Sequence, residues 1–172
     1  MMTYTRRATD ADLDAIIAIT DQAIAFLASQ NSPQWQGGDG PTRSEFATAI
    51  ANKIAYVLIH DGKVAGVAKL IPGPEKAYEE IDGAWQNDNQ HYMTIHRVAI
   101  DGRIQGKGLA KQLLRDLIML SIDHGFNDIR IDTHEMNTIM QHVVTTIGFT
   151  YQGMVEMPVA NGERKAYQLV LS

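Results

Sequence analysis

The stretch that decides the fold runs from Thr94 to Ile118 and reads TIHRVAI, then DGRIQGKG, then LAKQLLRDLI. Its first seven residues have the apolar and β-branched character of a strand. Its last ten residues place Leu113, Leu114 and Leu117 at helical spacing. The glycine-bearing turn between them feeds directly into the helix. We therefore predict a strand, a tight turn and a helix in succession.

This turn has the properties of a phosphate-binding site. The first N–H groups of a helix have no intrahelical acceptor, and the helix dipole adds partial positive charge there. Glycine lets the main chain approach a ligand closely. Basic residues recur every four positions around the turn, at Arg103, Lys107, Lys111 and Arg115. The turn therefore suits a ligand that carries several phosphates.

Other interpretations of the turn compete with a general phosphate site. A P-loop requires GxxxxGK[ST], and Gly106-Lys107-Gly108 has neither that spacing nor the hydroxyl residue. A dinucleotide fingerprint requires a third glycine where Lys111 stands, and it lies near the first strand of its domain. An ordinary glycine-containing turn before a solvated basic helix face remains the alternative.

The rest of the chain indicates a mixed α/β sheet of about six strands flanked by helices. A cap at Thr9–Asp12 precedes a helix to about Ser29, and a second cap at Thr42 starts another helix to about Ile54. Asp61-Gly62 predicts a hairpin turn between two strands. A polar loop to about Gln90 follows. The remaining expected elements are strands at 91–100, 128–133, 150–159 and 165–171, and helices at 109–125 and 138–147.

Composition narrows the class of protein. The 172 residues are 45% apolar and 20% charged, which is typical of one globular domain. The chain has no cysteine, so disulfides, thiolate metal sites and a Cys nucleophile are excluded. A net charge of −5 argues against a general nucleic-acid binder. With no apolar run long enough for a membrane span or a secretory signal, we expect a cytoplasmic protein without a membrane partner.

Two motifs resemble those of the GNAT superfamily of N-acetyltransferases. Residues Arg103–Ala110 resemble its (Q/R)xxGx(G/A) signature, after a strand that ends in Val98-Ala99-Ile100. Asn137 and then Ile147-Gly148-Phe149 resemble its second motif, an Asn that leads through a helix to "GF". The resemblance covers essentially the whole chain. It implies one GNAT domain over 1–172, with a mainly antiparallel central sheet of six to seven strands and about four helices.

The resemblance also implies acetyl-CoA as cofactor and assigns residues to it. Main-chain groups of Val98 and Ile100 would pair with the pantetheine arm, and Asn137 would bond near its pantetheine end. The amides of the turn would hold the pyrophosphate. The cofactor residues expected there are Arg103, Gln105, Gly106, Lys107, Gly108, Leu109 and Ala110. Asn137 is equally a favoured helix N-cap, and both roles are compatible.

The chemistry requires a base for the attacking amine, which we place at His96. In arylalkylamine N-acetyltransferases a strand histidine at this position is implicated in deprotonation, and period-2 alternation puts His96 on the face of Val98 and Ile100. A structural histidine in the core is the alternative, and His91 is a weaker candidate. The family's usual acid, a Tyr, is replaced by Val144. Tyr151, His134 or water would then protonate the thiolate, unless it leaves unassisted.

The acceptor is an amine of a small molecule or a peptide, and the sequence does not identify it. Aromatic residues could line its pocket or simply close a small core: Trp35, Tyr78, Trp85 and Tyr92. Glu79, Glu80 and Asp82 could attract a cationic amine or form a solvated loop. No metal site is expected, because His134-Glu135 lacks the second His of HExxH. A non-catalytic acetyl-CoA-binding module is the alternative function, and a homodimer is left open.

Overall fold

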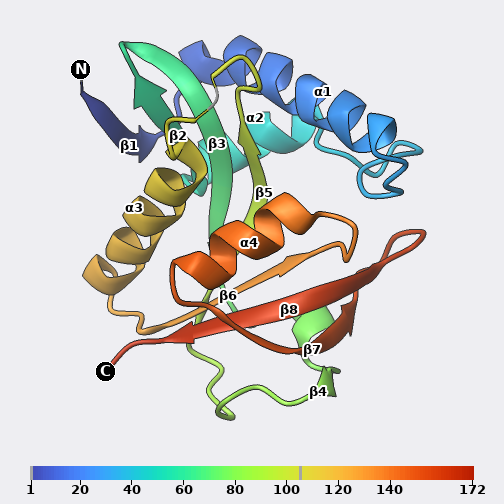
Figure 1. Cartoon of the computed structure of the whole chain (residues 1–172). Helices are drawn as coiled ribbons and strands as arrows, with labels where there is room; N and C mark the ends of the chain where they lie inside the picture. Colours follow the sequence, from blue (N-terminus) through green and yellow to red (C-terminus); the bar gives the residue numbers. More distant parts are fainter. Residues whose placement is uncertain (1, 105) are drawn as a thin grey trace. The chain divides into compact units, whose positions relative to one another are not determined.

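The computed structural model describes residues 2–104 and 106–172, which form four α-helices and eight strands (Figure 1). The predicted mixed α/β class, the four helices and the mainly antiparallel pairing are confirmed. The sheet has eight strands, slightly more than the six to seven expected. No helix in the described part of the chain combines the length and apolarity that crossing a membrane requires. The residues cluster into two compact units, which are described in turn.

The first unit comprises Met1–Leu70 and Arg97–Leu117. Its strands β1 (Thr3–Arg7), β2 (Ala55–His60) and β3 (Lys63–Pro72, as far as Leu70) pair antiparallel in sequence order. The second half of β5 (Met93–Ile100) follows on beside β3, where Asp101 N donates to Ala65 O at 2.8 Å. Its helices are α1 (Leu13–Ser29), α2 (Arg43–Ala51) and the first turns of α3 (Leu109–Asp123).

Local signals predicted α2 and the β2–β3 hairpin correctly. The hydroxyl of Thr42 accepts a hydrogen bond from Glu45 N at 3.1 Å, which caps α2 as predicted. Asp61 and Gly62 both have positive φ, 53° and 74°, which is the backbone of a two-residue hairpin turn. The core of this unit is apolar and joins α1 and α2 to the strands, through buried residues that include Ile16, Ile19, Phe46, Ala49, Val57, Ile59 and Val67.

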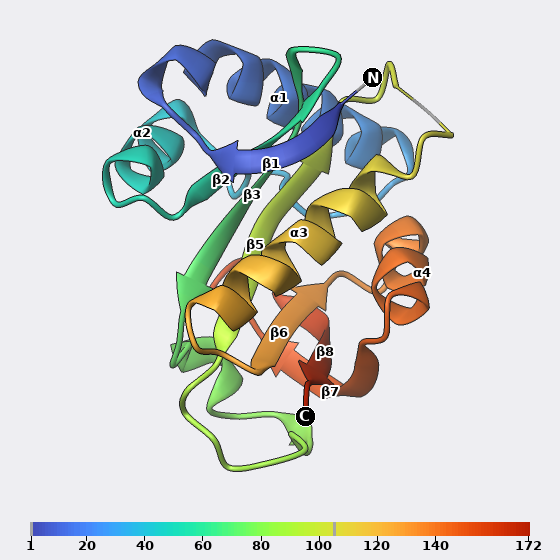
Figure 2. The ribbon, with the colours of Figure 1, turned by 90° about the vertical axis from the view of Figure 1, so that its left-hand side faces the viewer.

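The second unit comprises Ile71–His96 and Ile118–Ser172. Its strands are β4 (Asp82–Gly83), the first half of β5, β6 (Asp128–Thr133), β7 (Thr150–Glu156) and β8 (Glu163–Val170), in the hydrogen-bonded order β5-β6-β8-β7-β4. β5 and β6 run parallel, with Thr94 opposite Arg130, and the pairs that follow are antiparallel. Helix α4 (Thr138–Thr146) completes the unit and contacts β7 (Figure 2).

A long segment between β3 and β5 is ordered around one aromatic residue of this unit. It contains the short 3₁₀ helix η2 (Lys76–Tyr78) and β4, whose pairing with β7 brings Gly83 against Gly153. A Cβ at Gly153 would overlap the carbonyl oxygen of Asp82, so this strand pair requires glycine. Tyr78 is fully buried among Tyr92, Val155 and Ala166. The segment that composition predicted as a polar loop therefore carries part of the core.

Candidate active site

The predicted turn at the start of α3 is built as a cradle of main chain within the first unit. The buried Asp101 accepts hydrogen bonds from the main-chain N–H of Arg103 at 3.0 Å and from its guanidinium at 2.7–3.2 Å. These bonds hold the pKa of Asp101 below its ordinary value. Gly108 O accepts the first helical hydrogen bond, from Gln112 N at 3.0 Å. The start of α3 is thereby fixed.

Two glycines of this turn have backbone conformations that favour glycine. Gly106 has a φ of 69° and Gly108 a φ of 65°, and no atom lies within 4 Å of a Cβ built at either position. The demand at both positions is therefore conformational rather than steric. Open space beside main-chain N–H groups at a helix N-terminus is what an incoming phosphate requires. Gln105, between them and Arg103, lies outside the described residues.

The expected cofactor side chains differ in their engagement. The guanidinium of Arg103 is paired with Asp101, but the Arg103 side chain as a whole is 77% exposed, so it can still reach an anion. Lys107 is exposed, and Leu109 is buried as the first apolar residue of α3. Val98, Ile100 and Ala110 are half-buried. The side chain of Leu109 is thus used in packing, so any role of this residue in cofactor binding would rest on its main chain.

His96 lies in the second unit between two carboxylates. Its Nε2 is 3.7 Å from Oε2 of Glu75, and its Nδ1 is 3.8 Å from Oδ2 of Asp132. Nε2 is buried, and no described residue forms a hydrogen bond with it. The imidazole side chain is 18% exposed, so the ring is neither in open solvent nor sealed in the core. This arrangement can hold a proton or pass one on.

Tyr78 fixes the carboxylate on one side of this histidine. Its hydroxyl donates a hydrogen bond of 2.6 Å to Oδ2 of Asp132, and its ring centroid lies 6.2 Å from that of His96. Burial, together with the charge of Asp132, raises the pKa of Tyr78 well above 10. Tyr78 therefore stays protonated at neutral pH and remains a donor to Asp132.

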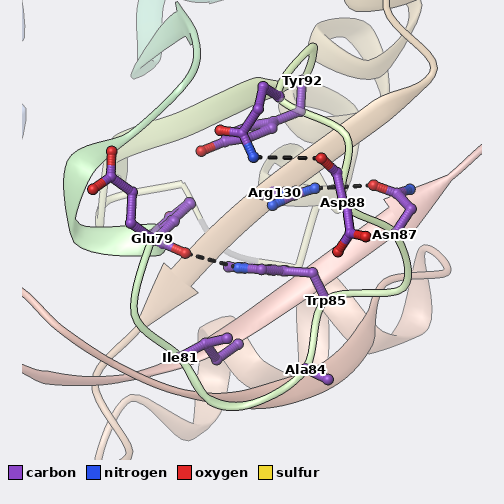
Figure 3. Close-up of a pocket in the computed structure, with 10 residues that line it drawn as sticks. Glu79, Ile81, Ala84, Trp85, Asn87, Asp88, Tyr92 and Arg130 are labelled. Carbon is purple, nitrogen blue, oxygen red and sulfur yellow. Dashed lines mark hydrogen bonds between the residues drawn. The ribbon is translucent and has the colours of Figure 1, made fainter.

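A cavity of about 300 Å³ opens on the other side of the Tyr78 segment (Figure 3). It is lined by Tyr78, Glu79, Ile81, Ala84, Trp85, Asn87, Asp88, Gln90, Tyr92 and Arg130. Figure 3 shows the Arg130 guanidinium between the rings of Trp85 and Tyr92, whose centroids lie 4.4 and 3.9 Å from its Cζ. Two of the aromatic residues that could have lined the acceptor pocket, Trp85 and Tyr92, therefore enclose a cation of the chain itself.

The charge of Arg130 is compensated from the same strand. Its Nε and one terminal nitrogen donate to the two oxygens of Asp128, both at 3.1 Å, and the pair is almost completely buried. Gln168 donates to both Asp128 oxygens as well.

In the first unit, Trp35 lies with its ring 5.7 Å from the guanidinium of Arg97, which pairs with Glu45. The four aromatic residues singled out from the sequence thus divide between the units.

The remaining candidates occupy structural positions. Asn137 is the N-cap of α4, because its side chain accepts from Met140 N at 3.1 Å. Val144, where the family's acid would stand, is buried and apolar. His91 is exposed and stacks on Phe126 with centroids 4.0 Å apart, and its Nε2 lies 3.2 Å from the carbonyl oxygen of Gly125. Glu80 and Asp82 are exposed, and Glu79 lines the cavity.

The possible proton donors named from the sequence also have partners. His134 is mostly buried and accepts from Met136 N at Nδ1, and burial followed by the charge of Arg164 lowers its pKa. It is therefore neutral near pH 7 and a weak acid. Tyr151 is half exposed, with its ring against Tyr167 at 5.8 Å.

Sequence reasoning missed Glu75, Asp132, Asp128 and Arg130. A signal for three of them was present, since DIRID places Asp128, Arg130 and Asp132 on one face of a strand that is otherwise apolar. Charged residues on a buried strand face need partners. No comparable signal marks Glu75, which reaches His96 only because the segment after β3 folds back.

Comparisons with known proteins show the family and the fold. The acetyltransferase (GNAT) family, as a sequence model, matches residues 21–149. A crystal structure of a GNAT-family acetyltransferase from Streptococcus agalactiae is 38% identical, with a TM-score of 0.91 over 99% of this chain and 96% of that one.

Curated relatives are more distant. An N-acetylaspartate synthetase of Xenopus tropicalis is 23% identical over 66% of this chain, and the N-acetyltransferase YesJ of Bacillus subtilis is 27% identical over 65%. The chain spans 39% and 62% of the lengths of these two relatives.

Proposed function

Because this chain belongs to the acetyltransferase (GNAT) family, we propose that it transfers the acetyl group of acetyl-CoA to an amine of a small molecule or peptide. Acyl transfer is the reaction class of the family, and acetyl-CoA is the co-substrate. The observation that supports the proposal most is the cradle before α3, where Gly106 and Gly108 adopt positive φ in open space. The family match covers this cradle.

In this proposal, main-chain groups bind most of the cofactor. The amides of residues 106–110 hold the pyrophosphate, with Arg103 and Lys107 adding positive charge. Gln105, outside the described residues, stays in the proposed set of cofactor residues. Val98 and Ile100 offer strand-like main-chain bonds to the pantetheine arm. Asn137 serves there in addition to capping α4, since its amide nitrogen has no part in the cap. The proposed domain spans 1–172, because the match over 21–149 draws residues from both compact units.

The proposed reaction is a direct attack assisted by His96. The amine gives a proton to Nε2 of the imidazole and attacks the thioester carbonyl, so that a C–N bond forms and the C–S bond breaks. The departing thiolate takes a proton from solvent, and the imidazolium returns its proton to solvent. Water is the proposed carrier because Val144 offers no proton and His134 is neutral.

Acetyl-CoA is expected to stabilise the fold, and Gly106→Val is expected to remove about half of that effect. At about 100 times its dissociation constant, the cofactor adds about 2.7 kcal/mol to the free energy of unfolding. A β-branched residue at a φ of 69° strains the turn and crowds the phosphate path. A tenfold loss of affinity lowers the stabilisation by about 1.4 kcal/mol. Thermal unfolding with and without acetyl-CoA measures both effects.

Gly62→Val is the matched control. Gly62 also has a positive φ, 74°, with nothing within 4 Å of its Cβ, but it lies in the β2–β3 hairpin. Its variant should lose intrinsic stability as Gly106→Val does and keep the full cofactor effect. If both variants keep the effect, the turn is not the phosphate site. If wild type gains nothing from millimolar acetyl-CoA, the proposed function is wrong.

A further inference from the structure

One ring nitrogen of His96 has no hydrogen-bond partner among the described residues. Nε2 of His96 is buried and forms no hydrogen bond with any described residue, yet Oε2 of Glu75 lies 3.7 Å away. A buried polar atom without a partner is costly unless something else fills the role. Two acceptors 3.7 Å apart can both lie about 2.9 Å from one nitrogen, which is hydrogen-bond distance. One group with at least two N–H donors could therefore donate to both.

The charge of the cluster favours a cation in that place. Two carboxylates, Glu75 and Asp132, face one imidazole, and the Asp132 side chain is only 8% exposed. The other titratable side chain against the ring is Tyr78, which η2 contributes as a neutral hydroxyl. The nearest cation along β6 is Arg130, and Asp128 already compensates it. The cluster as it stands is richer in negative than in positive charge.

We propose, on the basis of the proposed function, that Glu75 and His96 receive the acceptor as an ammonium ion. The substrate class is then basic aliphatic amines, which are protonated at neutral pH, rather than arylamines, which are not. Glu75 is the specificity-determining residue, because its carboxylate compensates the incoming charge. Asp132 and Tyr78 are positioning residues. They hold a proton on Nδ1 so that the lone pair of Nε2 faces the amine.

The proton balance follows from these positions. The ammonium, held by Glu75, transfers one proton to Nε2, and the imidazolium is stabilised by Asp132 at Nδ1. The neutral amine then forms the C–N bond while the C–S bond breaks, and the second nitrogen proton goes to the thiolate. The proton on His96 returns to solvent. Each step uses only the amine, acetyl-CoA and water.

Glu75→Gln tests the substrate class. We expect it to raise the KM for an aliphatic amine such as benzylamine about tenfold and to leave kcat within about threefold. Aniline, which is uncharged, should show little change in kcat/KM between the two enzymes. Asp61→Asn is the control, because Asp61 stands 3.5 Å from another half-buried histidine, His60. If the ratio of kcat/KM for benzylamine to kcat/KM for aniline is the same in Glu75→Gln as in the wild type, the assignment of Glu75 is overturned.

A binding measurement separates this inference from the proposed function. Methylammonium, the smallest primary ammonium, is added up to the hundred-millimolar range, and the ¹⁵N resonances of His96 are followed. These resonances are identified by their loss in His96→Ala. Sodium chloride at equal concentration is the control for ionic strength. We expect the His96 resonances to shift with methylammonium in the wild type and in Asp61→Asn. In Glu75→Gln they should shift far less. A response without any acetyl transfer would sink the proposed function and keep the cation site. Acetyl transfer without any change of the His96 resonances would keep the proposed function and overturn the cation site.

Opposite pH shifts test the positioning residues. Asp132→Asn removes a negative charge 3.8 Å from Nδ1, so the rising limb of kcat/KM should move to lower pH by about one unit. Tyr78→Phe removes the hydrogen bond to Asp132 and leaves its carboxylate less compensated, so the limb should move to higher pH. Tyr78→Phe changes one atom in the core, which keeps the test open if Asp132→Asn does not fold. Shifts in the same direction, or none, contradict the positioning role.

Discussion

Replacing Arg130 with methionine is expected to cost about 3–5 kcal/mol of stability, the largest loss for any single substitution proposed for this chain. Methionine keeps the flexible apolar stem between Trp85 and Tyr92, but the carboxylate of Asp128 is left buried without a cation. Asp128 would retain only the two bonds from Gln168. Because domains of this size are stable by about 5–15 kcal/mol, the variant should be close to unfolding. Urea denaturation measures the loss.

Two further variants show that burial is the cause. Arg43→Met removes a shorter but exposed pair, 2.8 Å to Asp14 with side chains 56% and 91% exposed, against 3.1 Å for Arg130 and Asp128, and it should cost less than about 1 kcal/mol. In the double variant Arg130→Met with Asp128→Asn, the stranded charge is gone and part of the loss should return. If Arg130→Met is no worse than Arg43→Met, the buried pair contributes no more to stability than the exposed one.

His96→Ala is expected to keep its affinity for acetyl-CoA and to lose about 10²–10⁴-fold in acetyl transfer, the usual range for general acid–base catalysis. The reason is that His96 is the group whose unpartnered nitrogen and flanking carboxylates can accept a proton. In the wild type, kcat/KM should rise with pH as the imidazole loses its proton. Repeating the profile with amines of different basicity assigns the limb, since one that stays put belongs to the enzyme.

His60→Ala is the matched control for this loss. His60 is buried to the same extent, 17% against 18% exposed, and it also stands beside an aspartate. Its loss should leave turnover within about threefold of the wild type. If His96→Ala folds, binds acetyl-CoA and turns over as well as His60→Ala, then His96 is structural, and the base must be sought at Glu75, at His91 or in solvent.

The fold was largely predictable because its main elements carry local signals. The Asp61-Gly62 turn, the Thr42 cap and the leucine spacing of α3 each fix an element without long-range information. β1 was missed because Thr3–Arg7 has the sequence TYTRR, which has no apolar alternation, and its pairing with β2 supplies what the sequence lacks. β4 is two residues long and exists only because β7 lies beside it.

The site was predictable only where one segment forms it. The turn of residues 101–108 is local, so its glycines and its place before α3 could be read directly. The surroundings of His96 depend on the parallel pairing of β5 with β6 and on the return of the segment after β3, both non-local. The sequence analysis considered Tyr78 and Trp85 as residues of a pocket. It could not show that Arg130, from a distant part of the chain, lies between Trp85 and Tyr92.

Release of the coenzyme A thiol in the presence of amines tests the central claim most directly. The protein is incubated with acetyl-CoA and a panel of primary amines, and the free thiol is measured over time against reactions without amine and against His96→Ala. We expect amine-dependent release by the wild type, matched by acetylated amine in equal amount. Acetyl-CoA that binds and stabilises the protein, with no release above the amine-free rate for any amine, would contradict the claim and point to a non-catalytic acetyl-CoA-binding module.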